Sequence, residues 1–143
     1  MKAQNEMKLV LLSKSVNESF SRVAVSAFLS QLDPTIDELN DIKTAVSEAV
    51  TNCIVHAYRN TIGKIYITVS IYENREVAIR IRDNGCGIED INKAREPLFT
   101  TAGDERAGLG FAVMESFMDK VRVNSKKDKF TSVLMKKKLG ERN

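Results

Sequence analysis

The stretch Asp83-Asn84-Gly85-Cys86-Gly87-Ile88 is the part of the chain from which its fold and its ligand are best inferred. It follows Val77-Ala78-Ile79-Arg80-Ile81-Arg82, in which apolar and polar residues alternate as in a half-buried β-strand. A strand that ends in an acid and two glycines leaves a carboxylate on a rigid element, beside backbone that a flat ligand can approach. A carboxylate accepts a hydrogen bond from the exocyclic amine of adenine but would face the carbonyl oxygen of guanine. The stretch therefore has two interpretations, a purine site that selects adenine or an ordinary Asp-Asn-Gly turn, and the other stretches of the chain decide between them.

The strand before this stretch has a partner. Residues 64–72 alternate in the same way and are joined to residues 76–83 by a Glu73-Asn74-Arg75 turn, which predicts a β-hairpin. Further strands are expected over residues 7–13, 120–125 and 130–139. A first helix, capped by Ser15 or Asn17, is expected to end near Leu32. Its predicted apolar face consists of Phe20, Val23, Ala24, Ala27 and Phe28, and its polar face of Asn17, Glu18, Ser21, Arg22 and Ser26.

A second, longer helix is predicted from Asp33-Pro34 to residue 57, with the acid as cap and the proline in the first turn. Apolar residues recur along it at helical spacing, so it is the expected core helix. Glu48, Asn52 and His56 are each four residues apart and form a polar row along one edge. Such a row can be ordinary boundary solvation, or it can be a site if phosphate-binding residues occur elsewhere.

Phosphate-binding residues are suggested by Arg106-Ala107-Gly108-Leu109-Gly110-Phe111, which is predicted to open a helix over residues 109–118. Free amides and the positive end of a helix dipole attract phosphate, and glycines let it approach. Arg106 could add a charge-assisted hydrogen bond, or it could be a surface residue. The preceding residues 95–107 show no periodicity and predict a mobile lid, after a short helix over residues 89–94.

Taken in this order, the three stretches resemble the nucleotide site of the gyrase, Hsp90, histidine-kinase and MutL ATPase superfamily. Within it the chain is similar to the small anti-sigma-factor serine kinases, from about residue 5 to about residue 139. The passages that carry this similarity are Leu32-Asp33-Pro34-Thr35-Ile36-Asp37-Glu38-Leu39, Val46-Ser47-Glu48-Ala49-Val50-Thr51-Asn52 and Pro97-Leu98-Phe99-Thr100-Thr101. The chain departs from the histidine kinases, because it lacks a full Gly-x-x-Gly-x-Gly array and its only histidine is His56, inside the core helix.

The resemblance implies a Bergerat-type ATP-binding fold, which is an α+β sandwich with a mixed, mainly antiparallel sheet and helices on one face. It implies that Glu48 is the catalytic base and that Asn52 binds Mg²⁺. Residues expected to contact ATP are Asn52, Asp83, Gly85, Gly87, Thr100, Thr101, Arg106, Gly108, Leu109, Gly110 and Thr131. Glu18 and Arg22 are candidate contacts for protein partners, since the first helix of the family lies near the surface offered to them.

The function implied by the resemblance is that of a homodimeric anti-sigma factor and ATP-dependent protein serine/threonine kinase. It would bind and inhibit a sporulation sigma factor of the sigma F type, and phosphorylate a serine of the anti-anti-sigma factor. Two alternatives stay open. The client could be a general-stress sigma factor, or the chain could be a nucleotide-gated sigma-binding protein without catalysis.

The length, composition and charge of the chain limit its expected domain number, location and partners. At 143 residues, with 43% hydrophobic and 29% charged residues, the chain is predicted to form one soluble domain over residues 1–143. No apolar run approaches the ~20 residues of a membrane span, so a cytoplasmic location without membrane contact is expected. The net charge of +3, the scattered basic residues and the 6% aromatic content argue against direct nucleic-acid binding. Cys53 and Cys86 suggest neither a disulfide framework nor a zinc site, and the role of Cys86 is undetermined.

Overall fold

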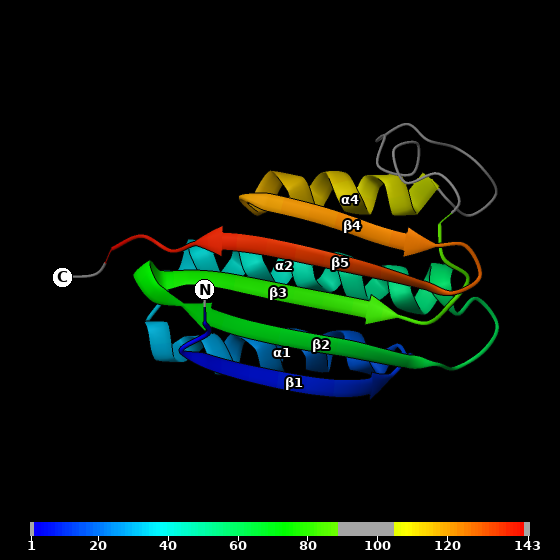
Figure 1. The fold of residues 1–143 in the computed structure, drawn as a ribbon, viewed down its shortest axis with the longest axis horizontal. Helices are drawn as coiled ribbons and strands as arrows, with labels where there is room; N and C mark the ends of the chain where they lie inside the picture. Colours follow the sequence, from blue (N-terminus) through cyan, green and yellow to red (C-terminus); the bar gives the residue numbers. More distant parts are fainter. Residues whose placement is uncertain (1, 89–104, 142–143) are drawn as a thin grey trace.

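The computed structural model of the chain describes residues 2–88 and 105–141. A five-stranded sheet forms one layer, and the helices cover one of its faces (Figure 1). The α+β sandwich predicted from the sequence is thereby confirmed. None of the helices within these ranges is long and apolar enough to cross a membrane. The strands are β1 (Asn5–Leu12), β2 (Lys64–Tyr72), β3 (Glu76–Asp83), β4 (Lys120–Lys126) and β5 (Phe130–Lys138), the helices α1 (Val16–Leu29), α2 (Ile36–Asn52) and α4 (Glu105–Phe117), and the shorter helical turns η1 (Ser30–Leu32), η2 (Cys53–Ala57) and η3 (Glu73–Arg75).

The strands are ordered β1-β2-β3-β5-β4 across the sheet, and each pairing between these described strands is antiparallel. The β2–β3 hairpin has the predicted bounds. Asn74 and Arg75 in its turn have φ angles of 60° and 63°, the left-handed conformation that a tight turn needs. β5 returns between β3 and β4, and this places Asp83 directly opposite Thr131.

The hydrophobic core lies between the sheet and α2. Successive strand residues point to opposite faces, so one set from β2 and β3 faces the helices. α2 contributes the other side, and its polar row is left along one edge. The buried residues contributed by these three elements are Ile65, Ile67, Val69 and Ile71 from β2, Val77, Ile79 and Ile81 from β3, and Ile42, Ala45, Val46, Ala49 and Val50 from α2.

The start of α2 differs from the prediction. Thr35 is the N-cap: its Oγ1 accepts a hydrogen bond from the Glu38 N–H at 3.1 Å, and Glu38 Oε1 accepts one from the Thr35 N–H at 2.9 Å. Asp33 instead ends η1 with a φ of 48°. The prediction of Asp33 as the cap is wrong, because a reciprocal capping box satisfies two free backbone amides and a single capping acid satisfies fewer.

The orientation of α1 also differs. Val25, Leu29 and Ser21 are its buried residues, whereas Phe20 and Val23, predicted to face the core, are exposed. The helix carries two apolar stripes, and the sheet and α2 can cover only one of them. The stripe that contains Phe20 and Val23 is therefore left exposed.

Candidate functional site

Asp83 ends β3 as predicted, and only 3% of it is exposed. Its Oδ1 accepts a hydrogen bond from the Gly85 N–H at 2.9 Å. Burial raises the pKa of Asp83, while hydrogen bonds from the Gly85 amide, the Cys53 thiol and the Thr131 amide oppose that rise. Asp83 is thus a carboxylate held in one orientation on a rigid strand end, as an acceptor for an exocyclic amine must be.

The glycines after Asp83 are required by packing within the protein. A Cβ atom on Gly85 would lie 2.4 Å from the Ala57 carbonyl oxygen, and one on Gly87 would lie 2.2 Å from that of Lys126. Gly87 also has a φ of 69°, which glycine adopts without strain. The Cys86 N–H donates to the Ala57 oxygen at 3.2 Å. The missing side chains thus let this loop dock against η2 and the β4–β5 turn, a reason that the sequence interpretation did not include.

Thr131, expected to support the adenine end, is buried on β5. Its hydroxyl oxygen lies 2.8 Å from that of Ser125, which donates to the Phe130 carbonyl and accepts from the Ile88 N–H, both at 2.8 Å. Ser125 thus links Thr131 to the loop after Asp83. Sequence reasoning missed Ser125, and the only signal for it is its place opposite Thr131 in the β4–β5 pair.

Tyr58 is a second residue that sequence reasoning missed. Its hydroxyl donates to the Lys64 carbonyl and accepts from the Asn84 N–H, both at 2.7 Å. Its buried ring lies against Gly63, where a Cβ atom would come within 2.2 Å of it. Burial raises the pKa of Tyr58, so the hydroxyl stays protonated and able to donate. Tyr58 therefore ties the residue after Asp83 to the start of β2, and no local sequence pattern marks it.

After Asn52, α2 continues into the π-helical turn η2, which leads toward the loop after Asp83. In this turn the Tyr58 N–H donates to the Cys53 carbonyl at 3.2 Å. Such turns occur frequently at functional sites. Cys53 is buried, and burial together with the charge of Asp83 raises the pKa of its thiol. The protonated thiol therefore remains available as a donor to Asp83. Cys86 is exposed, and its sulfur donates to the His56 carbonyl at 3.3 Å.

Glu48 and Asn52 lie together at the other end of the site, facing α4. A Cβ atom on Gly110 would lie 3.2 Å from Glu48 Oε2 and Asn52 Nδ2, and 3.3 Å from Asn52 Oδ1. The structure thus brings together three of the predicted site residues, two from the polar row on α2 and one from the glycine-rich segment. Gly110 is the residue that lets the two polar side chains approach α4 so closely.

The side-chain amide of Asn52 is a buried polar group of this site. Both polar atoms of its amide are buried, and neither has a hydrogen-bond partner among the residues that the structure describes. Leaving buried polar atoms unpaired costs about 1–3 kcal/mol each. A neutral amide oxygen beside a carboxylate suits Mg²⁺, which takes oxygen ligands and often only one or two from protein. The residues present therefore fit a bound magnesium ion and the phosphates that accompany it.

The glycine-rich segment lies deeper in its helix than predicted. α4 begins at Glu105, so Gly108, Leu109 and Gly110 fall within its first two turns and do not open it. Glu, Arg and Ala at residues 105–107 are good helix formers, which accounts for the earlier start. Arg106 lies in the first turn of α4. Thr100 and Thr101 lie outside the described residues, as do the predicted helix over residues 89–94 and most of the predicted lid.

Comparison with known proteins identifies the family to which this chain belongs. A family model described as a histidine kinase-like ATPase domain matches residues 14–137. The chain belongs to the histidine kinase-like ATPase family. Its curated relatives in that family include the anti-sigma F factor of Clostridium botulinum (strain Eklund 17B / Type B), 60% identical over 137 residues that cover 94% of this chain and 95% of the relative. The anti-sigma F factor of Caldanaerobacter subterraneus subsp. tengcongensis is 57% identical over 141 residues and covers 98% of both chains.

Solved structures agree on the fold. The RsbU and RsbW domains of Rv1364c from Mycobacterium tuberculosis match with a TM-score of 0.72 and 16% identity, over 97% of this chain and 34% of that one. The histidine kinase domain of Erythrobacter litoralis EL346 matches with a TM-score of 0.57 and 17% identity, over 85% of this chain and 61% of that one. The predicted ATP-binding fold is therefore confirmed, and ATP binding follows from membership of the ATPase family.

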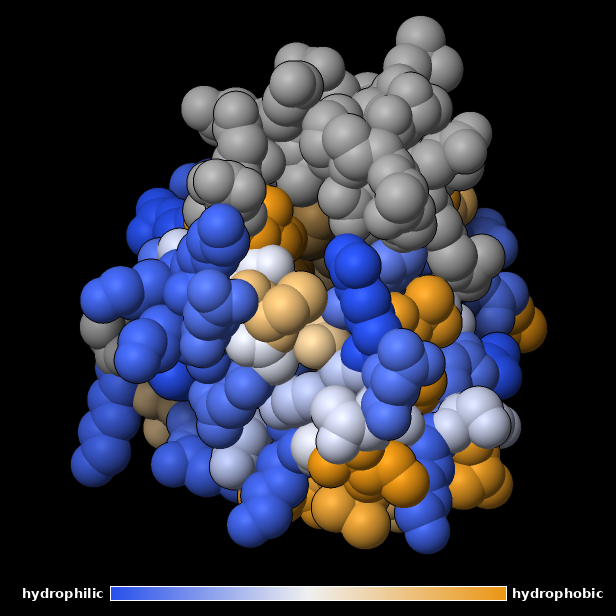
Figure 2. All heavy atoms as spheres, turned by 90° about the vertical axis from the view of Figure 1, so that its right-hand side faces the viewer, coloured by the Kyte–Doolittle hydropathy of each residue, from blue (hydrophilic) through white to orange (hydrophobic). Residues whose placement is uncertain are grey.

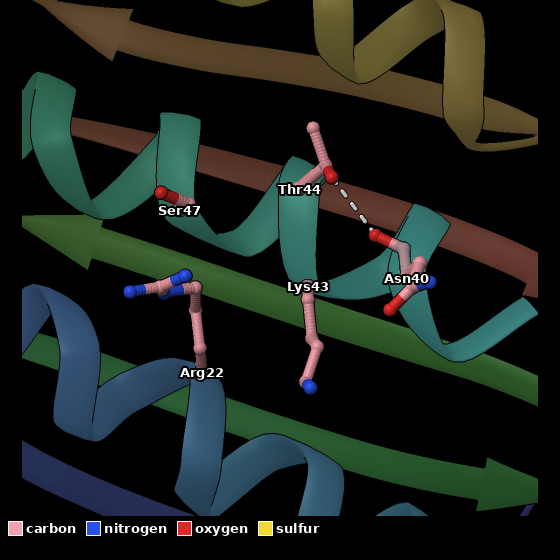
Figure 3. Close-up of a pocket in the computed structure, with 5 residues that line it drawn as sticks. All are labelled: Arg22, Asn40, Lys43, Thr44 and Ser47. Carbon is pink, nitrogen blue, oxygen red and sulfur yellow. Dashed lines mark hydrogen bonds between the residues drawn. The ribbon is translucent and has the colours of Figure 1, made fainter. Parts of the chain in front are cut away.

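Glu18 and Arg22, the predicted partner contacts, lie where α1 meets α2 in this ATPase fold. Arg22 Nε is 3.2 Å from Glu18 Oε1, and the same carboxylate oxygen accepts a hydrogen bond from Ser47, the neighbour of Glu48. Arg22 and Lys43 point into a groove of about 310 Å³ between the two helices (Figure 3). Its lining residues are Arg22, Asn40, Lys43, Thr44 and Ser47. Glu18 and Arg22 are thus connected to the helix that carries Glu48 and Asn52.

Proposed function

We propose that this chain is an anti-sigma factor and an ATP-dependent protein serine kinase. The observation that carries the proposal is the meeting of Glu48, Asn52 and Gly110 in a chain whose close relatives are anti-sigma F factors. Asn52 has unpaired amide atoms suited to a magnesium ion, and Glu48 is a carboxylate one helical turn away. A protein that only bound nucleotide would need a phosphate contact but would have no need of a carboxylate beside it.

Each residue has a defined part in this proposal. Asp83 accepts a hydrogen bond from the adenine amine, with Gly85, Gly87 and Thr131 around it, and thereby selects ATP over GTP. Asn52 supplies an oxygen to Mg²⁺, which when bound neutralises phosphate charge. Glu48 accepts the proton of a serine hydroxyl as that oxygen bonds to the γ-phosphorus and ADP leaves.

On the phosphate side, Arg106, Gly108, Leu109, Gly110, Thr100 and Thr101 remain predicted contacts. The amide groups of the first turn of α4 are the ones that the helix itself leaves unused, and they attract anions. Because α4 starts at Glu105, we assign this role to the amides before Gly108 as well as to the glycines.

The partners in this proposal are a sporulation sigma factor, inhibited in an ATP-dependent way, and an anti-anti-sigma factor that receives the phosphate. Glu18, Arg22 and the groove beside them are the proposed contact surface. Ser47 joins Glu18 to the helix of the site, so a protein bound there would lie next to the reacting groups. The name of the relatives favours a sporulation client over a stress-response client. A sigma factor as partner implies a cytoplasmic location.

The exposed stripe of α1 supports a homodimer. On α1, Val16 and Val23 are 69% and 60% exposed and Phe20 is also exposed. Val10 and Leu12 are exposed on the open face of β1, an edge strand of the described sheet. Apolar atoms gather at the bottom of the face in Figure 2, at the level where β1 and α1 lie in Figure 1. Exposed apolar side chains on both sides of an edge strand fit a second copy of the chain. Sedimentation of Phe20→Ser/Val23→Ser should give a monomer, while Ile36→Ser, at another exposed site, should not alter the oligomeric state.

The deciding experiment is transfer of phosphate from γ-labelled ATP and Mg²⁺ to a purified anti-anti-sigma protein, with wild type and Glu48→Gln compared. Glu73→Gln, in the exposed β2–β3 turn, is the matched control. Calorimetric titration with ATP establishes that all three proteins bind the nucleotide equally. We expect wild type and Glu73→Gln to label a serine, and Glu48→Gln to transfer at least a hundredfold more slowly.

The alternative function gives a different result. If all three proteins bind ATP and none transfers phosphate, the chain is a nucleotide-gated clamp on its sigma factor. If Glu48→Gln transfers as fast as wild type, the chain is a kinase in which Glu48 is not the base.

A further inference from the structure

The face of the sheet that the helices leave open carries a concentration of positive charge. This face is turned toward the reader in Figure 1. Strand residues alternate between the two faces, so the residues between the buried positions point outward. The outward cations are Lys8, Lys64, Arg80, Arg82, Lys120, Arg122, Lys126, Lys136 and Lys138, and the outward carboxylates are Glu6 and Glu76. The excess positive charge on this one face is larger than the net charge of the whole chain, which is +3.

Most of this charge has no counter-charge within the described residues. Lys8 lies 3.6 Å from Glu6. No carboxylate among the described residues forms an ion pair with Arg80, Arg122, Lys120, Lys126 or Lys136. Lys138 has Glu76 directly opposite it on β3. Lys120 and Lys136 face each other directly across β4 and β5, an arrangement of like charges that destabilises a sheet. A surface that keeps so many unpaired cations together is suited to a partner that brings the negative charge.

The cations are arranged as a track across the strands. The pairing places Arg122, Leu134, Arg80, Thr68 and Lys8 in one row. Strands are about 4.8 Å apart, so the cations of this row follow one another at about 10 Å. The next row of outward residues lies about 7 Å along the strands. It contains Lys120 and Lys136 at one end and Glu6 at the other. The track is therefore extended, as a polymer of negative charges would require.

We propose that this open face, centred on Arg80, Arg122 and Lys136, binds single-stranded nucleic acid through its phosphates. Arginine suits phosphate because its planar guanidinium donates two parallel hydrogen bonds. Arg82 stacks on the Phe130 ring, 4.6 Å from its centre, and Tyr66 lies directly opposite Arg82 on β2. Aromatic and arginine planes on an open sheet are the surfaces on which unpaired bases stack.

An acidic protein is a poorer occupant of the centre of this face. The centre of a protein interface is depleted in charge and rich in apolar anchors, whereas Leu134 is the only outward aliphatic residue of β3, β5 and β4 longer than alanine. The outward aliphatic residues of β1, Val10 and Leu12, lie at the edge of the face, away from Arg122 and Lys136. Nucleic-acid interfaces are much more positively charged. A flat sheet also offers no projecting element to enter the groove of a duplex, and this favours a single strand.

The sequence predicts no direct nucleic-acid binding, because its basic residues are scattered along the chain. The sheet order gathers many of them on one face, since β3, β5 and β4 lie side by side. The open face lies on the opposite side of the sheet from α2 and its Glu48 and Asn52, so the proposal does not depend on the nucleotide site.

The test is fluorescence anisotropy with a labelled 15-nucleotide oligo(dT) and the matching oligo(U), at potassium chloride concentrations from 50 to 200 mM. Arg80→Glu/Arg122→Glu is compared with Lys14→Glu/Arg59→Glu, which removes the same charge from exposed connections. Circular dichroism and ATP titration check that each variant is folded. We expect wild type to bind with an affinity that falls as salt rises, by a slope of about −0.7 per phosphate contacted. Arg80→Glu/Arg122→Glu should bind at least tenfold more weakly, and the control within about threefold of wild type.

Three results would overturn the proposal. Wild type could fail to bind either oligonucleotide at 50 mM salt. Both variants could lose affinity equally, which would mean that net charge and not this face is responsible. A polyglutamate peptide of the same charge could bind as tightly as the oligonucleotides, which would make the face a docking surface for acidic protein segments.

Discussion

The two ends of the proposed nucleotide site differ in whether protein groups satisfy their buried polar atoms. At the proposed adenine end the buried polar groups have protein partners. Asp83 accepts hydrogen bonds from Gly85, Cys53 and Thr131. The Tyr58 hydroxyl both donates and accepts a hydrogen bond. At the phosphate end the buried amide of Asn52 has no partner among the described residues. We propose that the first end is formed by protein groups alone, whereas bound phosphate and Mg²⁺ would complete the second. On this proposal base selection is a property of the folded chain, and phosphate binding offsets the cost of the unpaired Asn52 amide.

The largest effect is expected at the proposed adenine end. Asp83→Asn places an amide, which carries donors as well as an acceptor, where the adenine amine needs an acceptor alone. We expect the affinity for ATP to fall at least a hundredfold, which corresponds to about 2.7 kcal/mol. Titration calorimetry measures this, with Asp128→Asn in the exposed β4–β5 turn as the matched control. An Asp83→Asn protein that binds ATP as wild type does would remove Asp83 from the site.

Tyr58→Phe tests whether the adenine end is held by the protein itself. The change leaves the Asn84 N–H and the Lys64 carbonyl without their partner while the ring still fills its place against Gly63. We expect the free energy of unfolding to fall by about 1–3 kcal/mol. Urea denaturation without nucleotide measures it, and Tyr72→Phe on the open sheet face is the control. Equal stability of Tyr58→Phe and wild type would contradict the account of this end.

For Asn52→Ala we expect the opposite of Tyr58→Phe, a loss of ligand binding without a loss of stability. Because the amide has no partner to lose, its removal should leave the free energy of unfolding unchanged or raise it slightly, by about 1 kcal/mol. The affinity for ATP in the presence of Mg²⁺ should fall about tenfold or more, and its dependence on Mg²⁺ should disappear. Urea denaturation and calorimetry with and without Mg²⁺ measure the two effects. A destabilised variant with unchanged Mg²⁺ dependence would show that Asn52 is a structural residue.

The smallest effect is a pH dependence. Burial raises the pKa of Asp83, so the folded chain holds this proton to a higher pH than the unfolded chain does. As the pH rises from about 4 through the raised pKa, the free energy of unfolding should therefore fall slightly. The affinity for ATP should rise over the same window, because the ionised carboxylate is the better acceptor. Asp83→Asn should abolish both trends, and their persistence in that variant would assign them to another group.

Local sequence patterns can predict the elements whose conformation depends on neighbouring residues. The β2–β3 hairpin has the predicted bounds because alternation and turn chemistry act over neighbouring residues. The capping box of α2 is also a local pattern, since Thr35 and Glu38 stand three residues apart, but the prediction of Asp33 as the cap was wrong. Glu48, Asn52 and Asp83 were predicted as site residues from spacing and from resemblance, and the structure brings the first two together beside Gly110.

Features that depend on tertiary arrangement could not be predicted in this way. Two apolar stripes on α1 do not reveal which one is covered, so Phe20 and Val23 were misplaced. Tyr58 and Ser125 act on residues distant in the chain, and their sequence neighbours do not mark them. The cationic face required the insertion of β5 between β3 and β4, which alternation within single strands cannot reveal.

The most direct test of the central claim is calorimetric titration of the wild-type chain with ATP and with GTP, each with Mg²⁺. The account predicts one ATP bound per chain and GTP binding at least a hundredfold weaker, because a preformed carboxylate faces the base. Equal affinity for the two nucleotides, or no binding of either, would contradict it.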